Sequence, residues 1–413
     1  MEGTISMEKI MKRIDSYREE LVELQRKLTA IPALGPTNGG QGEFEKAQYL
    51  KSYLSGIGFD EIVDYDAPDP SVSCGFRPNF SARIKGHNKG KTIWVMSHLD
   101  IVPEGEDKLW DSKPYVIRVD GDKIYGRGVE DNQQGICSSL FAVKALKDEG
   151  LTPEYDVALL FVADEETGSK LGIQHILKVD KDIFKKEDII LIPDGGNEDG
   201  TMIEVAEKSI VWTKFTTLGK QTHGSRPESG INAHKAAAHL IVKLNSLYQL
   251  FPEKDPVFEP PISTFEPTKK EANVPNTNTI PGEDVFYLDS RVLPLYKLED
   301  VLKEMDRMCR ETEKEFGVKI SYEFPQKEQA APATPVDAPV VKILQKALKE
   351  VYNVEGKPMG IGGGTVAAYI RRVGVPAVVW SRTDETAHQP NECCKISNIL
   401  GDAKVFAHIF LQK

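Results

Sequence analysis

The chain has 413 residues, of which 40% are hydrophobic and 28% are charged, and its formal net charge is −11. This composition is that of folded globular proteins and excludes the disordered classes, while the length predicts two domains or more. Acidic and basic residues are interspersed, so we expect neither a basic surface that follows phosphates nor a nucleic-acid partner.

The first predicted element is an N-terminal amphipathic helix, because apolar residues recur at helical spacing from Ile10 to Leu28. This segment lacks the basic region and apolar core of a secretion signal, and no later stretch has the apolar length of a membrane span. The five cysteines form an odd set without zinc-ribbon or thioredoxin spacing, which favours a reducing compartment. We therefore expect a cytoplasmic protein without membrane association.

Three apolar segments in the first half of the chain are predicted to be buried strands that end in acidic or imidazole side chains. They are residues 91–102, 155–163 and 188–193, and residues 134–149 form a helix between the first strand and the second. This alternation predicts an α/β fold. Ligands bind at the carboxyl edge of the sheet in such folds, because the loops that leave the strands meet there.

The pattern changes near residue 208 and becomes typical of a β-α-β-β-α-β module. The predicted elements of this insert are a strand at 211–219, a helix at 231–250, a strand at 284–292 and a helix at 301–316. After a proline-rich return at 331–339, the expected elements are a helix at 340–352, a strand at 376–380 and a helix at 397–411. We predict one discontinuous α/β domain with a central, mostly parallel sheet, interrupted by a smaller α+β insert.

The first candidate site is Ser97-His98-Leu99-Asp100, at the end of the first strand. Side chains two residues apart on a strand point to the same side, so the Asp100 carboxylate is expected to orient the His98 ring for metal binding. The alternative is a hydrogen-bonded surface pair, which is the commoner use of this spacing.

The second candidate site is YGRGVEDN (125–132), where glycines permit a tight turn before Asp131 and a helix. Taken alone, Asp131 is better explained as a residue that caps the helix. Nucleotide binding is set aside, because the third glycine of the dinucleotide fingerprint is missing and no basic residue follows as in a P-loop.

More acids and a second histidine follow other strands. Asp164-Glu165-Glu166 follow the second strand, Asp194 follows the third, and His388 follows the late strand. One glutamate of a pair can bind a cation while its neighbour acts as general base, although an acid-rich helix N-terminus is the alternative. Together these sites predict a dinuclear centre with imidazole and carboxylate ligands, of the open, catalytic zinc type.

These motifs resemble those of the M20 metallopeptidases, which include succinyl-diaminopimelate desuccinylase, acetylornithine deacetylase and glutamate carboxypeptidases. The matching segments are SHLDIVP (97–103), YGRGVEDNQQG (125–135), DEETGS (164–169), PDGG (193–196), KQTHGSRPESGINA (220–233), NTIP (278–281), LDSRVLP (288–294) and AHQPNE (387–392). The resemblance covers nearly the whole chain. It implies a catalytic domain of residues 1–207 and 328–413, interrupted by a ferredoxin-like lid domain at 208–327 that forms a homodimer.

The resemblance also implies a metal centre of two Zn²⁺ ions, with Co²⁺ or Mn²⁺ as alternatives. Asp131 would bridge the ions, His98 and Asp194 would bind one, and Glu166 and His388 would bind the other.

The resemblance implies the remaining roles as well. Glu165 would be the general base that transfers a proton from a metal-activated water to the leaving amine. On the lid, His223 would stabilise the oxyanion, from the same chain or from the partner subunit. Asn278 and Arg291 would hold a substrate carboxylate, and Gly363 would lie in the substrate loop, where this chain has Val366 in place of the acidic or serine residue of many relatives.

The expected substrates are small acylated amino acids or short peptides. Deacylases, carboxypeptidases, dipeptidases and aminopeptidases share this metal chemistry, so the ligands do not distinguish them. A metal-binding homologue without turnover is the alternative from a different class, and it would be expected to lack ligands or the base.

Overall fold

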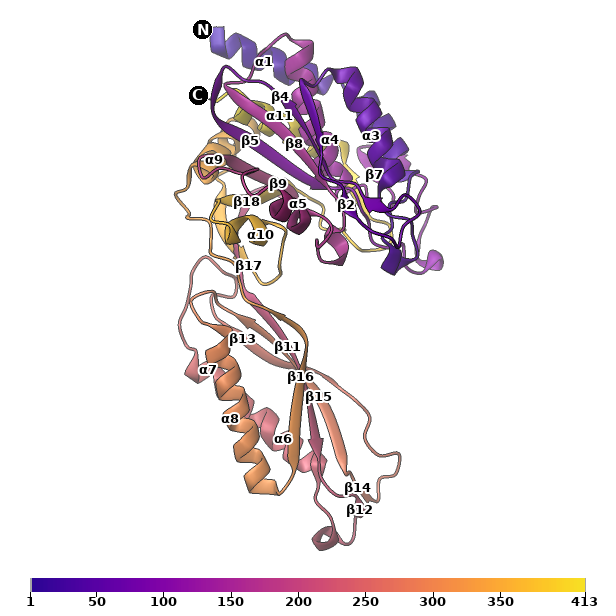
Figure 1. Cartoon of the computed structure of the whole chain (residues 1–413), viewed down its shortest axis with the longest axis vertical. Helices are drawn as coiled ribbons and strands as arrows, with labels where there is room; N and C mark the ends of the chain where they lie inside the picture. The colour runs from indigo at the N-terminus through magenta and orange to yellow at the C-terminus, as the bar shows by residue number, and fades with distance from the viewer. Residues whose placement is uncertain (1, 413) are drawn as a thin grey trace. The chain divides into compact units, whose positions relative to one another are not determined.

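The computed structural model describes residues 2–412, with side chains from residue 7 onward. The chain divides into two compact units (Figure 1). The first unit contains the chain up to Val205, Thr334–Pro358 and the chain from Tyr369; the second contains Ala206–Ala333 and Met359–Ala368. Met359–Ala368 fall in the range that the sequence assigned to the catalytic domain. They join the second unit through backbone pairing, such as the 3.0 Å hydrogen bond from Lys208 N to the Ile361 carbonyl.

The first unit is built on an eight-stranded sheet. In spatial order its strands are β1 (Glu61–Asp64), β4 (Phe80–Ile84), β8 (Tyr155–Val162), β5 (Asn88–His98), β9 (Ile189–Asn197), β18 (Ala377–Arg382), β10 (Met202–Glu207) and β17 (Lys357–Ile361). The central strands β8, β5, β9 and β18 are parallel, whereas β4 and β10 pair antiparallel to them. Most residues of the central strands are buried and apolar, as expected for parallel strands covered by helices. The predicted α/β class is therefore confirmed.

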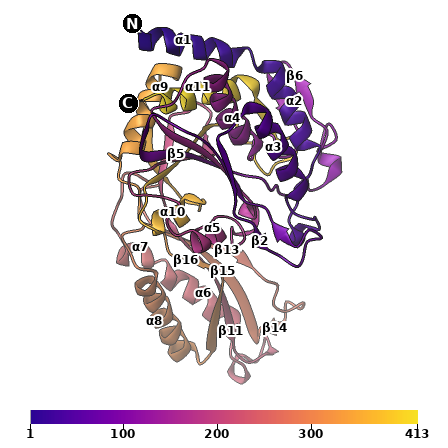
Figure 2. The same cartoon turned by 45° about the horizontal axis from the view of Figure 1, so that its top comes forward.

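The helices outside the insert are α1 (Glu2–Asp15), α2 (Arg18–Thr29), α3 (Phe44–Ile57), α4 (Gln133–Asp148), α5 (Ile173–Val179), α9 (Pro339–Tyr352), α10 (Ala367–Arg372) and α11 (Ile396–Phe410). Helices α4, α9 and α11 contact the sheet, and α1 and α2 contact α4 and α11 (Figure 2). The predicted N-terminal helix is interrupted at Ser16 and Tyr17, so that α1 and α2 bury their apolar stripes separately.

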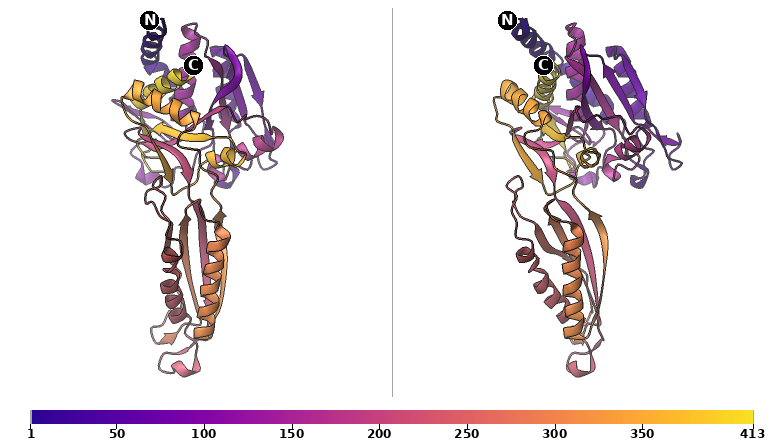
Figure 3. Two further views of the ribbon diagram at one scale, coloured as in Figure 1. Left: turned by 90° about the vertical axis from the view of Figure 1, so that its left-hand side faces the viewer. Right: turned by 60° about the vertical axis from the view of Figure 1, so that its left-hand side comes forward.

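The second unit has the predicted β-α-β-β-α-β order. Its main elements are β11 (Ser209–Leu218), α6 (Ala233–Leu244), β13 (Thr264–Lys270), β15 (Glu283–Val292), α8 (Leu298–Phe316) and β16 (Lys319–Glu328). The antiparallel sheet has the order β13-β15-β11-β16, which is the ferredoxin-like arrangement. Helix α8, orange in Figure 3, runs along this sheet, and its apolar residues contribute to a core with α6. The predicted helix 231–250 is shorter than expected, because Asn245 and Ser246 separate α6 from α7 (Leu247–Leu250).

The pairing of β11 with β15 determines which residues share each end of this sheet. Ile210 pairs with Arg291 at one end, and Leu218 pairs with Glu283 at the other. Eight residues of strand separate these pairs, which corresponds to about 27 Å at the usual rise per residue. The ribbon of β12 (Thr222–His223) and β14 (Thr279–Ile280) continues from the Leu218 end and forms one tip of the unit (Figure 1).

The remaining short elements are β2 (Ala67–Pro68), β3 (Phe76–Arg77), β6 (Arg118–Asp120), β7 (Lys123–Tyr125), β19 (Cys393–Lys395) and the 3₁₀ turns Pro36–Asn38, Asp107–Leu109, Glu165–Thr167 and Pro227–Ser229. Strand β7 pairs with β19, which places Tyr125 opposite Cys393. This pairing brings the segment that leads to Asp131 beside the segment that follows His388. Within residues 2–412, no helix combines the length and the hydropathy that a membrane span requires.

Candidate active site

Adjacent parallel strands bring four predicted site residues to one edge of the first unit's sheet. His98 is the last residue of β5, Glu165 and Glu166 follow β8 in a 3₁₀ turn, and Asp194 lies in β9. Because β5 lies between β8 and β9, the carboxyl ends of all three strands are neighbours. Strand β9 continues beyond Asp194, whereas the sequence had placed this residue after the strand.

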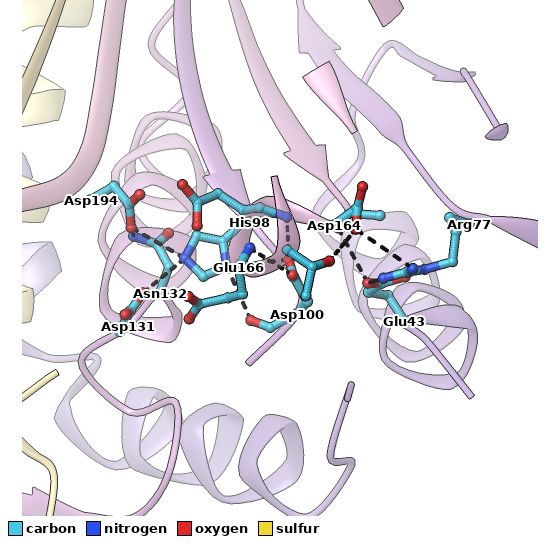
Figure 4. Close-up of polar contacts among 12 residues, drawn as sticks. Glu43, Arg77, His98, Asp100, Asp131, Asn132, Asp164, Glu166 and Asp194 are labelled. Carbon is cyan, nitrogen blue, oxygen red and sulfur yellow. Dashed lines mark hydrogen bonds and ion pairs between the residues drawn. The ribbon is translucent and has the colours of Figure 1, made fainter. Parts of the chain in front are cut away.

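His98 contacts two carboxylates through one ring nitrogen. Its Nε2 lies 2.8 Å from Asp131 Oδ1 and 3.2 Å from Asp194 Oδ1. Asn132 donates a hydrogen bond through Nδ2 to Asp194 Oδ1 at 2.7 Å, which restrains that carboxylate. The three groups converge from separate elements (Figure 4), and their ligand atoms all lie within 4.8 Å of one another.

His388 forms a second group around the other oxygen of Asp131. Its Nε2 lies 3.0 Å from Asp131 Oδ2 and 3.1 Å from Glu166 Oε2. The His388 side chain is 54% exposed, so this group faces solvent more than the His98 group does. Asp131 is common to both groups of candidate ligands, and the structure brings all five predicted ligands together.

Asp100 holds the turn that carries Glu165 and Glu166. Its Oδ1 accepts from Glu165 N at 3.1 Å, and its Oδ2 accepts from Glu166 N at 3.0 Å. The Asp100 carboxylate also lies beside the His98 ring, with its Oδ1 3.5 Å from His98 Nδ1, while the Asp100 backbone carbonyl lies 3.0 Å from the same nitrogen. The expected role of this carboxylate in orienting His98 stays a prediction. Strand β5 itself ends at His98, whereas the sequence had extended this strand to residue 102.

Glu392 is a buried residue whose role the sequence analysis did not identify. It accepts hydrogen bonds from the Arg127 guanidinium at 2.7 Å and from the backbone N–H groups of Gly128, Glu130 and Asp131. These donors form the turn before Asp131, so Glu392 fixes the backbone of the shared carboxylate. The only signal in the sequence was its position at the end of AHQPNE, since its partners lie more than 250 residues away.

Glu130 makes the reciprocal connection. Its carboxylate accepts from Asp384 N at 2.5 Å and from Thr386 N at 2.6 Å, in the loop that leads to His388. The segments that carry Asp131 and His388 are therefore joined twice, once by each glutamate.

Glu392→Gln is expected to lower the free energy of unfolding by about 3 kcal/mol, because it leaves the Arg127 guanidinium buried without its carboxylate. Urea denaturation of the metal-free protein would measure this loss. The role given to Glu392 would be contradicted by an unfolding free energy that lies within about 1 kcal/mol of the wild-type value. Comparisons of this kind have a precision of about 0.5 kcal/mol.

The electrostatics of the cluster fit the binding of cations. Hydrogen bonds with Asp131 and Glu166 raise the pKa of His388 to about 10. Burial lowers the pKa of His98, but the nearby carboxylates, with Asp194 first, outweigh burial and raise this pKa well above its usual value. Carboxylates that raise the pKa of two imidazoles create a strongly negative potential, which divalent cations would neutralise. Nitrogen and oxygen donors without thiolates suit zinc, cobalt or manganese at a catalytic centre.

Glu165 lies next to the cluster but belongs to neither group of candidate ligands. Burial, followed by the charge of Asp194, raises the pKa of its carboxyl well above the usual value. A cavity of about 180 Å³ borders the cluster and is lined by residues that include Asp131, Asp194, Gly195 and Thr383. A small substrate therefore has access to the edge of the sheet where the carboxylates meet.

The other predicted site residues lie in the second unit. His223 pairs with Thr279 in the β12–β14 ribbon, and Gly224 N donates to the Asn278 carbonyl at 2.6 Å. The imidazole of His223 is exposed, and its Nδ1 lies 2.8 Å from Ser225 Oγ. His223 and Asn278 are thus neighbours at the ribbon tip.

Arg291 lies at the opposite end of the same sheet. Its guanidinium donates to both oxygens of Asp289, at 2.7 and 3.0 Å, and to the Gly362 carbonyl at 2.7 Å. Arg291 is therefore close to the glycine loop that contains Gly363. The strand register places Arg291 and the ribbon that carries Asn278 at opposite ends of the sheet, so the two side chains of one chain do not meet on a single carboxylate. Their predicted joint contact with a substrate carboxylate would need a residue from each of two chains.

Comparison with known proteins agrees with this site. The profile of peptidase family M20/M25/M40 matches residues 94–412. An uncharacterized metallohydrolase of Methanocaldococcus jannaschii is 40% identical over 406 residues, which are 95% of this chain and 98% of that protein. A succinyl-diaminopimelate desuccinylase of Nautilia profundicola is 25% identical over 375 residues, which are 90% of this chain and 93% of the relative.

Solved structures share the fold. The aminopeptidase PepT from Bacillus cereus has a TM-score of 0.75 to this chain at 20% identity, over 95% of this chain and 98% of the other. The length of the match includes both units. The chain therefore belongs to peptidase family M20/M25/M40 and is a metal-dependent hydrolase.

Proposed function

We propose that this enzyme hydrolyses the amide bond of small N-acyl amino acids or short peptides with two bound divalent cations, Zn²⁺ or its substitutes Co²⁺ and Mn²⁺. The observation that carries this proposal is the position of Asp131. Each of its two carboxylate oxygens lies within 3.0 Å of an imidazole nitrogen from a different ligand group. A carboxylate shared in this way is suited to bridge two cations.

The remaining ligands would divide between the two cations. His98 and Asp194 would hold one, and Glu166 and His388 would hold the other. When bound, the two cations would lower the pKa of a water held between them and thereby supply the nucleophile at neutral pH.

Glu165 would perform the proton transfers. Its carboxylate would take a proton from the attacking water and return it to the nitrogen of the leaving amine. Asp100 supports this role, because it accepts the backbone N–H of Glu165 and restrains the turn on which the base lies.

We further propose a homodimer in which His223 and Asn278 act on a substrate bound to the partner subunit. His223 would donate to the oxygen on which negative charge develops. The register of β11 and β15 separates Arg291 by about 27 Å from the Leu218 end, where the ribbon with His223 begins, whereas a dipeptide spans only about 7 Å. One small substrate therefore contacts both ends only if they belong to different chains.

Mixing two inactive variants tests this arrangement. His223→Ala and Asp131→Ala are each expected to lower turnover strongly, while an equal mixture of exchanged subunits should recover about a quarter of wild-type activity. Half of the dimers in such a mixture are mixed, and each of these has one site with intact ligands and an intact His223. Exchange that is verified by tagged chains, with no recovery of activity, would show that His223 acts within its own chain.

The substrate class is to be tested with protein reconstituted with Zn²⁺. N-succinyl and N-acetyl amino acids, dipeptides and amino-terminal peptide substrates would be compared by kcat/KM. The desuccinylase relative supports the acyl amino acids, and the aminopeptidase-like fold makes peptides the alternative. A protein that binds two cations but hydrolyses none of these amides would contradict the proposed function.

We also propose a cytoplasmic location. The support is that all five cysteines are free, as a reducing compartment favours.

A further inference from the structure

A buried ion pair lies behind the turn that carries Glu165. Arg77, in β3, donates through Nε to Glu43 Oε2 at 2.6 Å and through its second terminal nitrogen to Glu43 Oε1. Glu43 directly precedes α3, and both side chains are at most 3% exposed. A bidentate pair removed from water in this way is geometrically rigid.

This ion pair is connected to the turn after β8. Glu43 Oε1 accepts from the backbone N–H of Asp164 at 3.3 Å, and the Arg77 guanidinium lies 3.9 Å from the Asp164 carboxylate. Figure 4 shows Arg77 and Glu43 beside Asp164, and Asp100 beside Glu166 and His98; the backbone of residues 164–166 connects the two groups. Consecutive backbone N–H groups of residues 164, 165 and 166 are therefore all bound by carboxylates.

Asp164 needs such restraint, because its φ of 61° lies in the left-handed region. A non-glycine residue holds this conformation at a cost, and it persists where the surroundings determine it. The Asp164 carboxylate also accepts hydrogen bonds from Thr167 Oγ1 and from Leu171 N, and these two bonds further restrain the turn.

The segment before α3 encloses the ion pair. Gly42 has a φ of 75°, and a Cβ at this position would lie 2.9 Å from Arg77 Nε. The backbone approaches the guanidinium so closely that a side chain at this position would displace Arg77 from its place beside Glu43.

We propose that Arg77 and Glu43 are positioning residues for the reaction, which set the place of Glu165 and Glu166 by holding the backbone of Asp164. They touch neither substrate nor cation, and they act through the turn. The kinetic consequence rests on the proposed function, whereas the restraint on the turn does not.

Arg77→Lys keeps the charge but loses the bidentate fork, and Arg77→Met removes the charge and leaves Glu43 buried alone. Both are expected to lower kcat per metal-loaded site by roughly 10- to 100-fold with little change in KM, because the turn that carries Glu165 is displaced while the groups that bind substrate are unchanged. The double variant Glu43→Gln with Arg77→Met restores neutrality, and its amide oxygen still accepts from Asp164 N. It should be more active than Arg77→Met alone.

The matched control is another buried arginine–carboxylate pair of the first unit. Arg371 contacts Glu204 at 2.8 and 3.1 Å, and both side chains are 1% exposed. Arg371→Met and Arg371→Lys should lower Tm as the Arg77 variants do, without changing kcat per metal-loaded site.

Hydrogen exchange of the metal-free proteins measures the turn directly. Amides of residues 164–166 should exchange about 10-fold faster in Arg77→Lys and in Arg77→Met than in wild type, the double variant should exchange more slowly than Arg77→Met, and the Arg371 variants should match wild type there. Exchange that is unchanged in the Arg77 variants would overturn the proposal, and so would equal acceleration in the Arg371 variants. If wild-type protein shows no metal-dependent amide hydrolysis, the proposed function fails, and the exchange result still decides whether Arg77 holds the turn.

Discussion

Glu165→Gln is expected to leave the metal content near that of wild type and to lower kcat by on the order of 100-fold or more, the usual cost of losing a general base. Glu165 is in neither group of candidate ligands, so its carboxylate is not needed to hold a cation. Glutamine has the same shape and keeps the backbone N–H that donates to Asp100. The substitution therefore removes the proton acceptor and little else.

The neighbouring residue provides the control for this experiment. Glu166→Gln changes the same functional group one position along the same turn, but Glu166 contacts His388 and belongs to a ligand group. It should lower the metal content, and excess Zn²⁺ should restore part of its activity. Excess metal should not help Glu165→Gln. Wild-type kcat in Glu165→Gln, or rescue of that variant by added metal, would remove Glu165 from the role of base.

The elements that bear the ligands were predictable because the pattern that identifies them is local. An apolar run that ends in His98, in Glu165 and Glu166, or near Asp194 indicates a buried strand and a polar residue at its carboxyl end within a few positions of the chain. Parallel strands place those ends at one edge, so their meeting follows from the fold class. The patterns also placed His388 and Asp131 in one centre, but only the family resemblance implied that Asp131 is shared between the two groups of ligands.

The contacts that support the ligands were not predictable from such patterns. Glu392, Glu130 and Glu43 act by accepting backbone N–H groups, and any carboxylate can do so wherever the chain approaches. Which acid approaches which turn depends on pairings such as β7 with β19, which join distant segments. The hydrogen bonds of the Asp100 carboxylate to the backbone of Glu165 and Glu166 were missed for the same reason, since those residues lie 65 and 66 positions away in the chain.

The placement of Arg291 and Asn278 shows a further limit. Both lie in motifs that match the family, and matching motifs suggest a common ligand. The register of β15 against β11 places them at opposite ends of a sheet, and register depends on turn geometry and on the packing of the inner face. Neither determinant is visible in the motifs themselves.

Asp131→Ala is expected to affect the metal centre more than any other single ligand substitution, and to lower activity below that of Glu165→Gln. Asp131 is the one residue in both groups of candidate ligands found among the described residues, so its loss weakens both cation sites at once. It also removes the one carboxylate that contacts both His98 and His388, which leaves each ring with a single carboxylate of its own group. Metal analysis after exhaustive dialysis should find fewer than one cation per chain, against two in wild type.

Substitutions of ligands that belong to only one of the two groups provide the comparison for Asp131→Ala. Among the candidate ligands, Asp194→Ala removes a contact of His98 alone, and His388→Ala removes contacts of Glu166 and Asp131 on the other side, so each should leave about one tightly held cation per chain. Titration of the metal-free variants with Zn²⁺ would then show two weak steps for Asp131→Ala and one strong step for each of the others. If Asp131→Ala retained two tightly bound cations, the carboxylate would not be shared, and the dinuclear arrangement proposed for this enzyme would be wrong. If Asp194→Ala lost both cations as completely as Asp131→Ala, the two sites would not be separable, and the division of ligands between them would have to be revised.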